Sequence, residues 1–143
     1  MRVFSLCTAV FVCVLFLGGC EKQTTPVYDA FSCVLSDESY TLRYEQTDAG
    51  ASMTVLSPES IAGLTLCWRG ADCRLLYDAD GVSLSLPVTE AVTGGFASLP
   101  ACFWQNARTD KNGIPTETAI RHPNQPTQTR FVVTEFTPVQ PSE

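Results

Sequence analysis

The chain has 143 residues, of which 45 % are hydrophobic, with 7 cysteines and a formal net charge of −6. This length fits a single domain with one modest core, and it excludes a multidomain enzyme. The acidic balance excludes a general nucleic-acid binder, because phosphate contacts require clustered lysine and arginine side chains.

Residues 1–19 have the layout of a secretory signal peptide. Met1-Arg2 precedes an apolar stretch, Val3 to Leu17, which is shorter than the roughly 20 residues that a transmembrane helix needs. The segment Leu17-Gly18-Gly19-Cys20 resembles the bacterial lipobox, which implies that Cys20 is lipidated and becomes the first residue of the mature protein. An ordinary signal peptide that is cleaved elsewhere is the alternative.

The expected anchor places the protein at a membrane. Two or more acyl chains on Cys20 hold a protein there stably, because each buried CH₂ contributes about 0.8 kcal/mol. We therefore expect a lipid-anchored chain at the cell membrane, facing outside the cytoplasm, with residues 20–27 as the lipidated cysteine and a short polar tether.

Residues 28–137 are expected to form a β domain, and residues 138–143 a disordered tail. Apolar and polar residues alternate with period two between turn signals, which predicts a mainly β fold with a strongly curved antiparallel meander sheet. Only residues 87–99 allow a helix, and Gly94-Gly95 limits it to one or two turns. The predicted strands are 39–45, 52–56, 63–68, 73–77, 82–86, 102–108, 114–120 and 129–136, with 114–120 as an edge strand because of Pro115.

The order of these segments resembles the LolA-like lipoproteins over residues 39–136. The resemblance rests on the strand Tyr40–Tyr44, the break Pro58-Glu59 before Gly63, and a last strand after Asn112-Gly113-Ile114-Pro115. It implies a half-barrel sheet whose concave apolar face is plugged by helices, and in the carriers of that family this face holds acyl chains. This chain is itself lipidated by the lipobox interpretation and is short, so an anchored domain acting in a membrane complex is expected.

The concave face would be lined by apolar residues of the alternating strands. A hydrophobic ligand there would contact Tyr40, Leu42, Tyr44, Val55, Leu84 and Leu86.

Four cysteines remain besides Cys20, and outside the cytoplasm they favour two disulfides. For the hairpin between Cys67 and Cys73, one register places the two thiols opposite each other and the other places them on opposite faces. The disulfide register is preferred, with Cys33 and Cys102 as the second pair. A zinc site is the weaker alternative, because these spacings lack the closely spaced ligand pairs that zinc sites use.

No segment carries a catalytic motif or a phosphate-binding loop. The single histidine, His122, lies in a proline-punctuated loop and is interpreted as a solvated side chain. Phe103 and Trp104 are adjacent in a predicted strand and would point to opposite faces. Trp104 or Trp68 would then either pack under a loop or mark an exposed partner-binding patch.

These observations lead to a non-enzymatic role without a cofactor. The first hypothesis is that the protein binds a protein partner or assembles in a cell-envelope complex. The alternative is that the concave face binds a lipid or another hydrophobic ligand.

Overall fold

The computed structural model describes residues 28–89 and 93–139 of the chain. The predicted signal peptide, the lipidated Cys20 and the tether to residue 27 lie outside these described residues. The same holds for residues 90–92 and 140–143.

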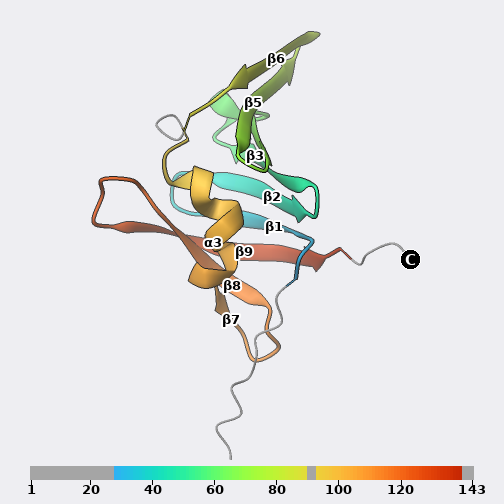
Figure 1. Ribbon diagram of the computed structural model, residues 1–143. Coiled ribbons are helices and arrows are strands. Elements are labelled where there is room, and N and C mark those ends of the chain that lie inside the picture. The colour runs from blue at the N-terminus through green and yellow to red at the C-terminus, as the bar shows by residue number, and fades with distance from the viewer. Residues whose placement is uncertain (1–27, 90–92, 140–143) are drawn as a thin grey trace, which may run out of the picture.

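The described residues form one open, antiparallel sheet (Figure 1), which confirms the mainly β fold. Its order is β6-β5-β4-β3-β2-β1-β9-β8-β7, so the first six strands form one meander. Strand β9 pairs with β1, and β8 and β7 follow it outward. The nine strands are β1 (Phe31–Ser36), β2 (Thr41–Thr47), β3 (Gly50–Ser57), β4 (Thr65–Arg69), β5 (Asp72–Ala79), β6 (Val82–Pro87), β7 (Arg108–Thr109), β8 (Pro115–Arg121) and β9 (Gln128–Pro138).

Strand β1 was not predicted, although it lies in the middle of the sheet. It pairs with β2 on one side and with β9 on the other. Phe31, Cys33 and Leu35 alternate along it and are all buried, whereas Val34 is buried on the other face. Val34 therefore interrupts the simple apolar–polar alternation that identified the other strands.

The segment 102–108 was predicted as a strand, and this prediction was wrong. Residues Leu99–Asn106 form the helix α3, which follows the 3-10 turn η2 (Gly94–Ser98). Pro100 stands in the first turn of α3, where its missing N–H costs nothing because that donor has no partner inside the helix. A second 3-10 turn, η1 (Glu59–Ile61), follows the Pro58 break.

Two boundary predictions are also corrected. Strand β8 is not an edge strand, because the two-residue strand β7 pairs with it; Pro115 is tolerated as the first residue of β8. The tail does not leave the fold at Thr137, because β9 continues to Pro138 and the N–H of Val139 donates to the Ala30 carbonyl over 2.9 Å.

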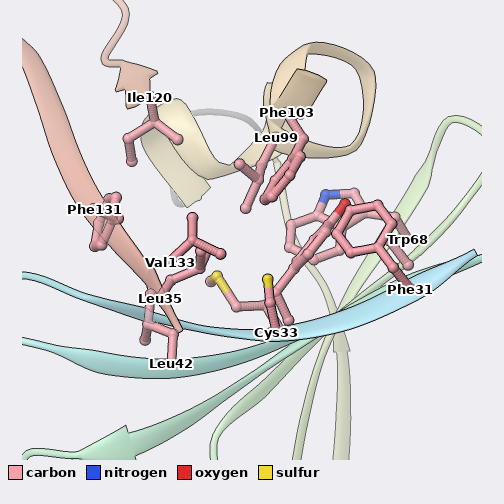
Figure 2. Packing of buried hydrophobic residues seen from close by; sticks show 13 residues of the cluster. Phe31, Cys33, Leu35, Leu42, Trp68, Leu99, Phe103, Ile120, Phe131 and Val133 are labelled. Atoms are coloured by element: carbon pink, nitrogen blue, oxygen red, sulfur yellow. The ribbon is translucent and has the colours of Figure 1, made fainter. Parts of the chain in front are cut away.

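The main core lies between α3 and the strands β1, β2, β8 and β9. Figure 2 shows Leu99 and Phe103 of α3 pointing toward the sheet, and both are fully buried. The Phe103 ring stacks on Tyr44 with centroids 5.6 Å apart. Further buried members of this cluster are Phe31, Cys33, Leu35, Leu42, Ala51, Met53, Trp68, Ile120, Phe131 and Val133.

Phe103 and Trp104 do not occupy opposite faces as predicted, since they lie on a helix. Trp104 is half-buried, packs against the core, and donates its Nε1–H to the Tyr28 carbonyl over 3.2 Å. Trp68 is 6 % exposed, and its buried Nε1 has no hydrogen-bond partner among the described residues. Neither tryptophan therefore forms an exposed patch.

Replacing Phe103 by alanine is expected to lower the free energy of unfolding by about 3–5 kcal/mol, because it leaves a cavity between α3 and the sheet. Denaturant unfolding of the purified protein measures this loss. Gln105→Ala is the matched control, since Gln105 is exposed on the same helix. Equal effects of the two substitutions would contradict the packing of α3 described above.

Candidate functional site

Apolar side chains continue across the sheet beyond the part that α3 covers. On β2 to β5 they meet residues of η1 and η2 and line an apolar groove of about 240 Å³. The sheet register aligns its floor, because Met53 pairs with Leu66 and Leu66 with Leu75. We call this hollow the apolar groove; it is lined by Tyr40, Leu42, Met53, Val55, Ile61, Leu64, Leu66, Leu75, Val88, Thr93 and Phe96.

The wall of the groove is fixed by the connection between β3 and β4. The N–H of Gly63 donates to the Val55 carbonyl over 2.9 Å, and the N–H of Val55 donates to the Leu64 carbonyl over 2.8 Å. Gly63 has a φ of 89°, which favours glycine, so it can turn the chain back onto β3. This turn holds Ile61 and Leu64 over the floor.

A row of exposed apolar side chains extends the groove onto the hairpin β5–β6. Leu75 lines the groove and pairs with Leu86, while Tyr77 pairs with Leu84, so these residues share one face. Side chains on β6 are among the most exposed of the large apolar residues: Val82 is 65 % exposed, Leu84 43 % and Leu86 44 %. We call Tyr77, Val82, Leu84 and Leu86 the apolar strip. Figure 1 shows this hairpin projecting away from α3.

The six residues predicted for a hydrophobic ligand divide into three groups. Tyr40, Leu42 and Val55 line the groove, and Leu84 and Leu86 lie on the strip. Tyr44 is instead fully buried under α3, and its hydroxyl donates to Gln46 Oε1 over 2.8 Å. Sequence reasoning did not name the other lining residues on predicted strands, Met53, Leu64, Leu66 and Leu75. It also missed Ile61 and Phe96, which come from 3-10 turns where the period-two pattern gives no signal.

A second groove of about 470 Å³, lined by charged, polar and apolar residues, lies largely against the other face of the hairpins. Its floor includes one cross-strand row, in which Glu45 pairs with Ser52, Ser52 with Cys67, and Cys67 with Arg74. Charges of both signs line it, and Arg74 Nε donates to Ser85 Oγ over 2.9 Å. Among residues 28–89 and 93–139, no group of three or more His, Cys, Asp or Glu side chains could hold a metal ion.

The predicted disulfides are absent: all four cysteines of the described residues are free. The preferred register of the β4–β5 hairpin was wrong, because Arg69 pairs with Asp72 around a two-residue turn. Cys67 therefore faces the second groove, and Cys73, which pairs with Trp68, points to the opposite face. The alternative register was correct, since it aligns the apolar residues of both strands on one face.

Burial distinguishes the chemistry of the thiols. Cys33 is 2 % exposed in the main core, and this burial raises its pKa to about 12. The pKa of Cys73 is also raised, first by burial and then by the negative charges of Asp72 and Cys67. Cys102 on α3 donates its thiol hydrogen to the Ser98 carbonyl over 2.9 Å.

His122 was interpreted as a solvated loop residue, but the structure holds it half-buried. Its Nδ1 accepts the Gly95 N–H over 3.3 Å, and its Nε2 lies 3.3 Å from the Thr129 hydroxyl. The Phe96 ring meets it edge-on at 6.5 Å. His122 therefore fastens η2, which carries the groove residue Phe96, to the β8–β9 hairpin.

Comparisons of the chain with protein-family models, with curated proteins and with solved structures found no match. Within the described ranges, no helix has the length and apolar character required to cross a membrane.

Thiol labelling tests the assignment of free cysteines. Without reductant, the unfolded protein should take up one iodoacetamide label each at Cys33, Cys67, Cys73 and Cys102, as read from peptide masses. In the folded protein at pH 8, Cys33 should react at least about a hundredfold more slowly than Cys67, because it is buried and its thiolate is scarce. A disulfide-linked peptide pair among the four would contradict the structure.

Proposed function

We propose that this chain is a membrane-anchored bacterial lipoprotein with a non-enzymatic role, which binds a protein partner of the cell envelope through the apolar groove and the apolar strip. The observation that carries the proposal is the continuous apolar surface on one face of β2 to β6. Soluble domains rarely leave such contiguous apolar surface uncovered unless it binds something. The resemblance of Leu17-Gly18-Gly19-Cys20 to a lipobox supports the anchor and the cellular compartment.

The size of the groove favours side chains of a protein over a whole small ligand. Small-molecule sites enclose about 300–1,000 Å³ and bury most of the ligand. The apolar groove has about 240 Å³, and it continues into an exposed strip on β6. This shape suits one or two apolar anchor side chains in the groove, with further contacts along the strip.

Polar groups at the rim would orient such a partner. Tyr40 is 42 % exposed at the groove, and tyrosine is enriched at protein interfaces because it combines an apolar ring with a hydroxyl that can hydrogen-bond. The chain carries a net charge of −6, so long-range attraction would favour a partner with a basic surface.

Acyl-chain binding is a second candidate, because Tyr40, Leu42 and Val55 line the groove where a hydrophobic ligand was predicted. An acyl chain could follow the groove and then the strip toward Leu84 and Leu86.

In-cell photocrosslinking of the full chain distinguishes the two candidates. With benzoylphenylalanine in place of Tyr40, we expect one discrete protein adduct in the membrane fraction. The same group in place of Val132, which is 54 % exposed on β9 and outside the groove, is the matched control and should give no such adduct. Ile61→Glu should reduce the Tyr40 adduct at least about tenfold, because a charge in the groove opposes apolar docking.

The outcomes decide between the possibilities. Adducts of lipid mass at Tyr40 would replace the protein-partner proposal by the lipid candidate. Equal protein adducts at both positions, or none at either, would contradict a binding role of the apolar face.

In the same cells, Cys20→Ala should abolish acyl labelling and membrane retention, and unchanged labelling would remove the anchor from the proposal.

A further inference from the structure

In the part of the chain that the structure describes, strand β6 is the longer of the two unpaired edges of the sheet. The opposite edge, β7, has only two residues. Edge strands commonly carry charges or bulges that prevent pairing with another chain. The segment Val82-Ser83-Leu84-Ser85-Leu86 contains neither a charged residue nor an irregular register with β5.

The hydrogen-bonding direction of each residue of β6 follows from two observations. Ala79 and Val82 flank the two-residue turn Asp80-Gly81, whose φ values of 52° and 77° are those of a type I′ hairpin. At the other end, the N–H of Val88 donates to the Cys73 carbonyl over 3.0 Å. Because hydrogen-bonded pairs alternate along antiparallel strands, Val82, Leu84 and Leu86 bond to β5.

The serines between them therefore present their backbone groups to the free edge. Ser83 and Ser85 each present one N–H and one carbonyl there. The Ser85 carbonyl also accepts from Arg74 Nη2 over 3.5 Å, and its second lone pair is left for the edge. Pro87 occupies the next outward position but has no N–H, so it ends the stretch that can pair. The available edge is five residues long and has its centre at Leu84.

This edge is symmetric about Leu84 in side-chain character. Apolar Val82 and Leu86 are equidistant from the centre, as are the two serines. We propose that β6 pairs antiparallel with β6 of a second copy of this chain, about a two-fold axis at Leu84. Ser83 of each copy would then exchange two backbone hydrogen bonds with Ser85 of the other, which makes four bonds in total.

Side chains and charges fit this pairing. Leu84 would lie directly opposite Leu84 of the second copy, and Val82 opposite Leu86, so the two apolar strips would join on one face. The Asp80 turns would lie at opposite ends of the paired strands, roughly 20 Å apart at about 3.3 Å per residue. A parallel pairing would bring these carboxylates together and is disfavoured by their repulsion.

Shifted registers leave outward serine groups without a partner or bring turn residues into the pairing. Centring the pair on Ser85 also gives four bonds, but it places Ser83 opposite Pro87, so the Ser83 carbonyl has no donor. Centring the pair on Leu86 places Pro87 opposite Ser85, where a donor is missing. Centring it on Val82 places the turn residues Asp80 and Gly81 against the strand of the second copy. The register centred on Leu84 alone uses both serines of each copy as donors and acceptors.

Cysteine crosslinking of the full chain in intact cells tests this pairing. Leu84→Cys should form a disulfide-linked dimer on mild copper-catalysed oxidation, because residues opposite each other in a non-hydrogen-bonded pair lie close enough for a disulfide. A non-reducing denaturing gel measures the dimer. Val82→Cys and Leu86→Cys are the matched controls, and each should give at least about fivefold less dimer, since neither faces itself. The unsubstituted chain gives the background of its own thiols.

A backbone variant tests the hydrogen bonds. Ser83→Pro added to Leu84→Cys should lower the dimer band at least about tenfold, because it removes an outward N–H without touching a bond to β5. Ser83→Thr should preserve the band. The pairing would be overturned by a Leu84→Cys band no stronger than the background, by equal bands at positions 82, 84 and 86, or by insensitivity to a well-expressed Ser83→Pro chain.

Two further outcomes are decisive. A Leu84→Cys adduct with a different protein would show that the edge takes another partner, and it would overturn the self-pairing. If Ser83→Pro prevents accumulation of the protein, the dimer bands of Val82→Cys, Leu84→Cys and Leu86→Cys decide whether β6 pairs with itself. Ile61→Glu should leave the dimer unchanged, so loss of the groove partner and loss of the dimer are separate results.

Discussion

The Phe31 ring joins the three parts of this fold. Its centroid lies 4.8 Å from Phe103 of α3, 5.8 Å from Tyr44 of β2 and 5.3 Å from Phe136 of β9. The first meander, the helix and the last strand are far apart in the sequence, and their contact at Phe31 closes the core. Burial of several aromatic rings in one cluster supplies a large part of the apolar area that a domain of this size can remove from water. The pairing of β1 with β9 depends on the same cluster, since both strands contribute to it.

The position of this cluster determines which part of the sheet is left for binding. The helix α3 is a single short element, and it packs on β8 and on the strands around Phe31. The hairpin β5–β6 therefore retains an apolar face that no helix of residues 28–89 and 93–139 covers, and η1 and η2 close only the groove at its base. The same alternation that builds the core under α3 thus produces an exposed surface where α3 ends. The proposed partner site and the proposed pairing of β6 both follow from that incomplete cover.

The sequence predicted the hairpins well, because one face of each is apolar and the turns carry clear signals. Asp110 shows this most directly: its carboxylate accepts the N–H groups of Asn112 and Ile114 in the turn just before the predicted strand 114–120. The helix α3 was missed because eight residues with adjacent Phe103 and Trp104 show little helical periodicity. The cysteine register was misjudged because the possible disulfide outweighed the pairing of Leu66 with Leu75. The sequence predicted three residues of the apolar groove, Tyr40, Leu42 and Val55. The wall of the groove depends on the packing of loops and 3-10 turns, which the alternation of apolar and polar residues does not predict.

Native-state hydrogen exchange of the full chain tests most directly whether the Phe31 cluster carries the stability of the domain. Amides bonded between β1 and β9 should exchange slowest, because they open only when the aromatic core is lost. Amides bonded between β5 and β6 should exchange at least about tenfold faster, because that hairpin can separate from the sheet without exposing the cluster. Two results would contradict a core centred on Phe31 with an uncovered hairpin. One is that the β5–β6 amides exchange slowest in the domain, and the other is that the amides between β1 and β9 exchange as fast as those between β5 and β6.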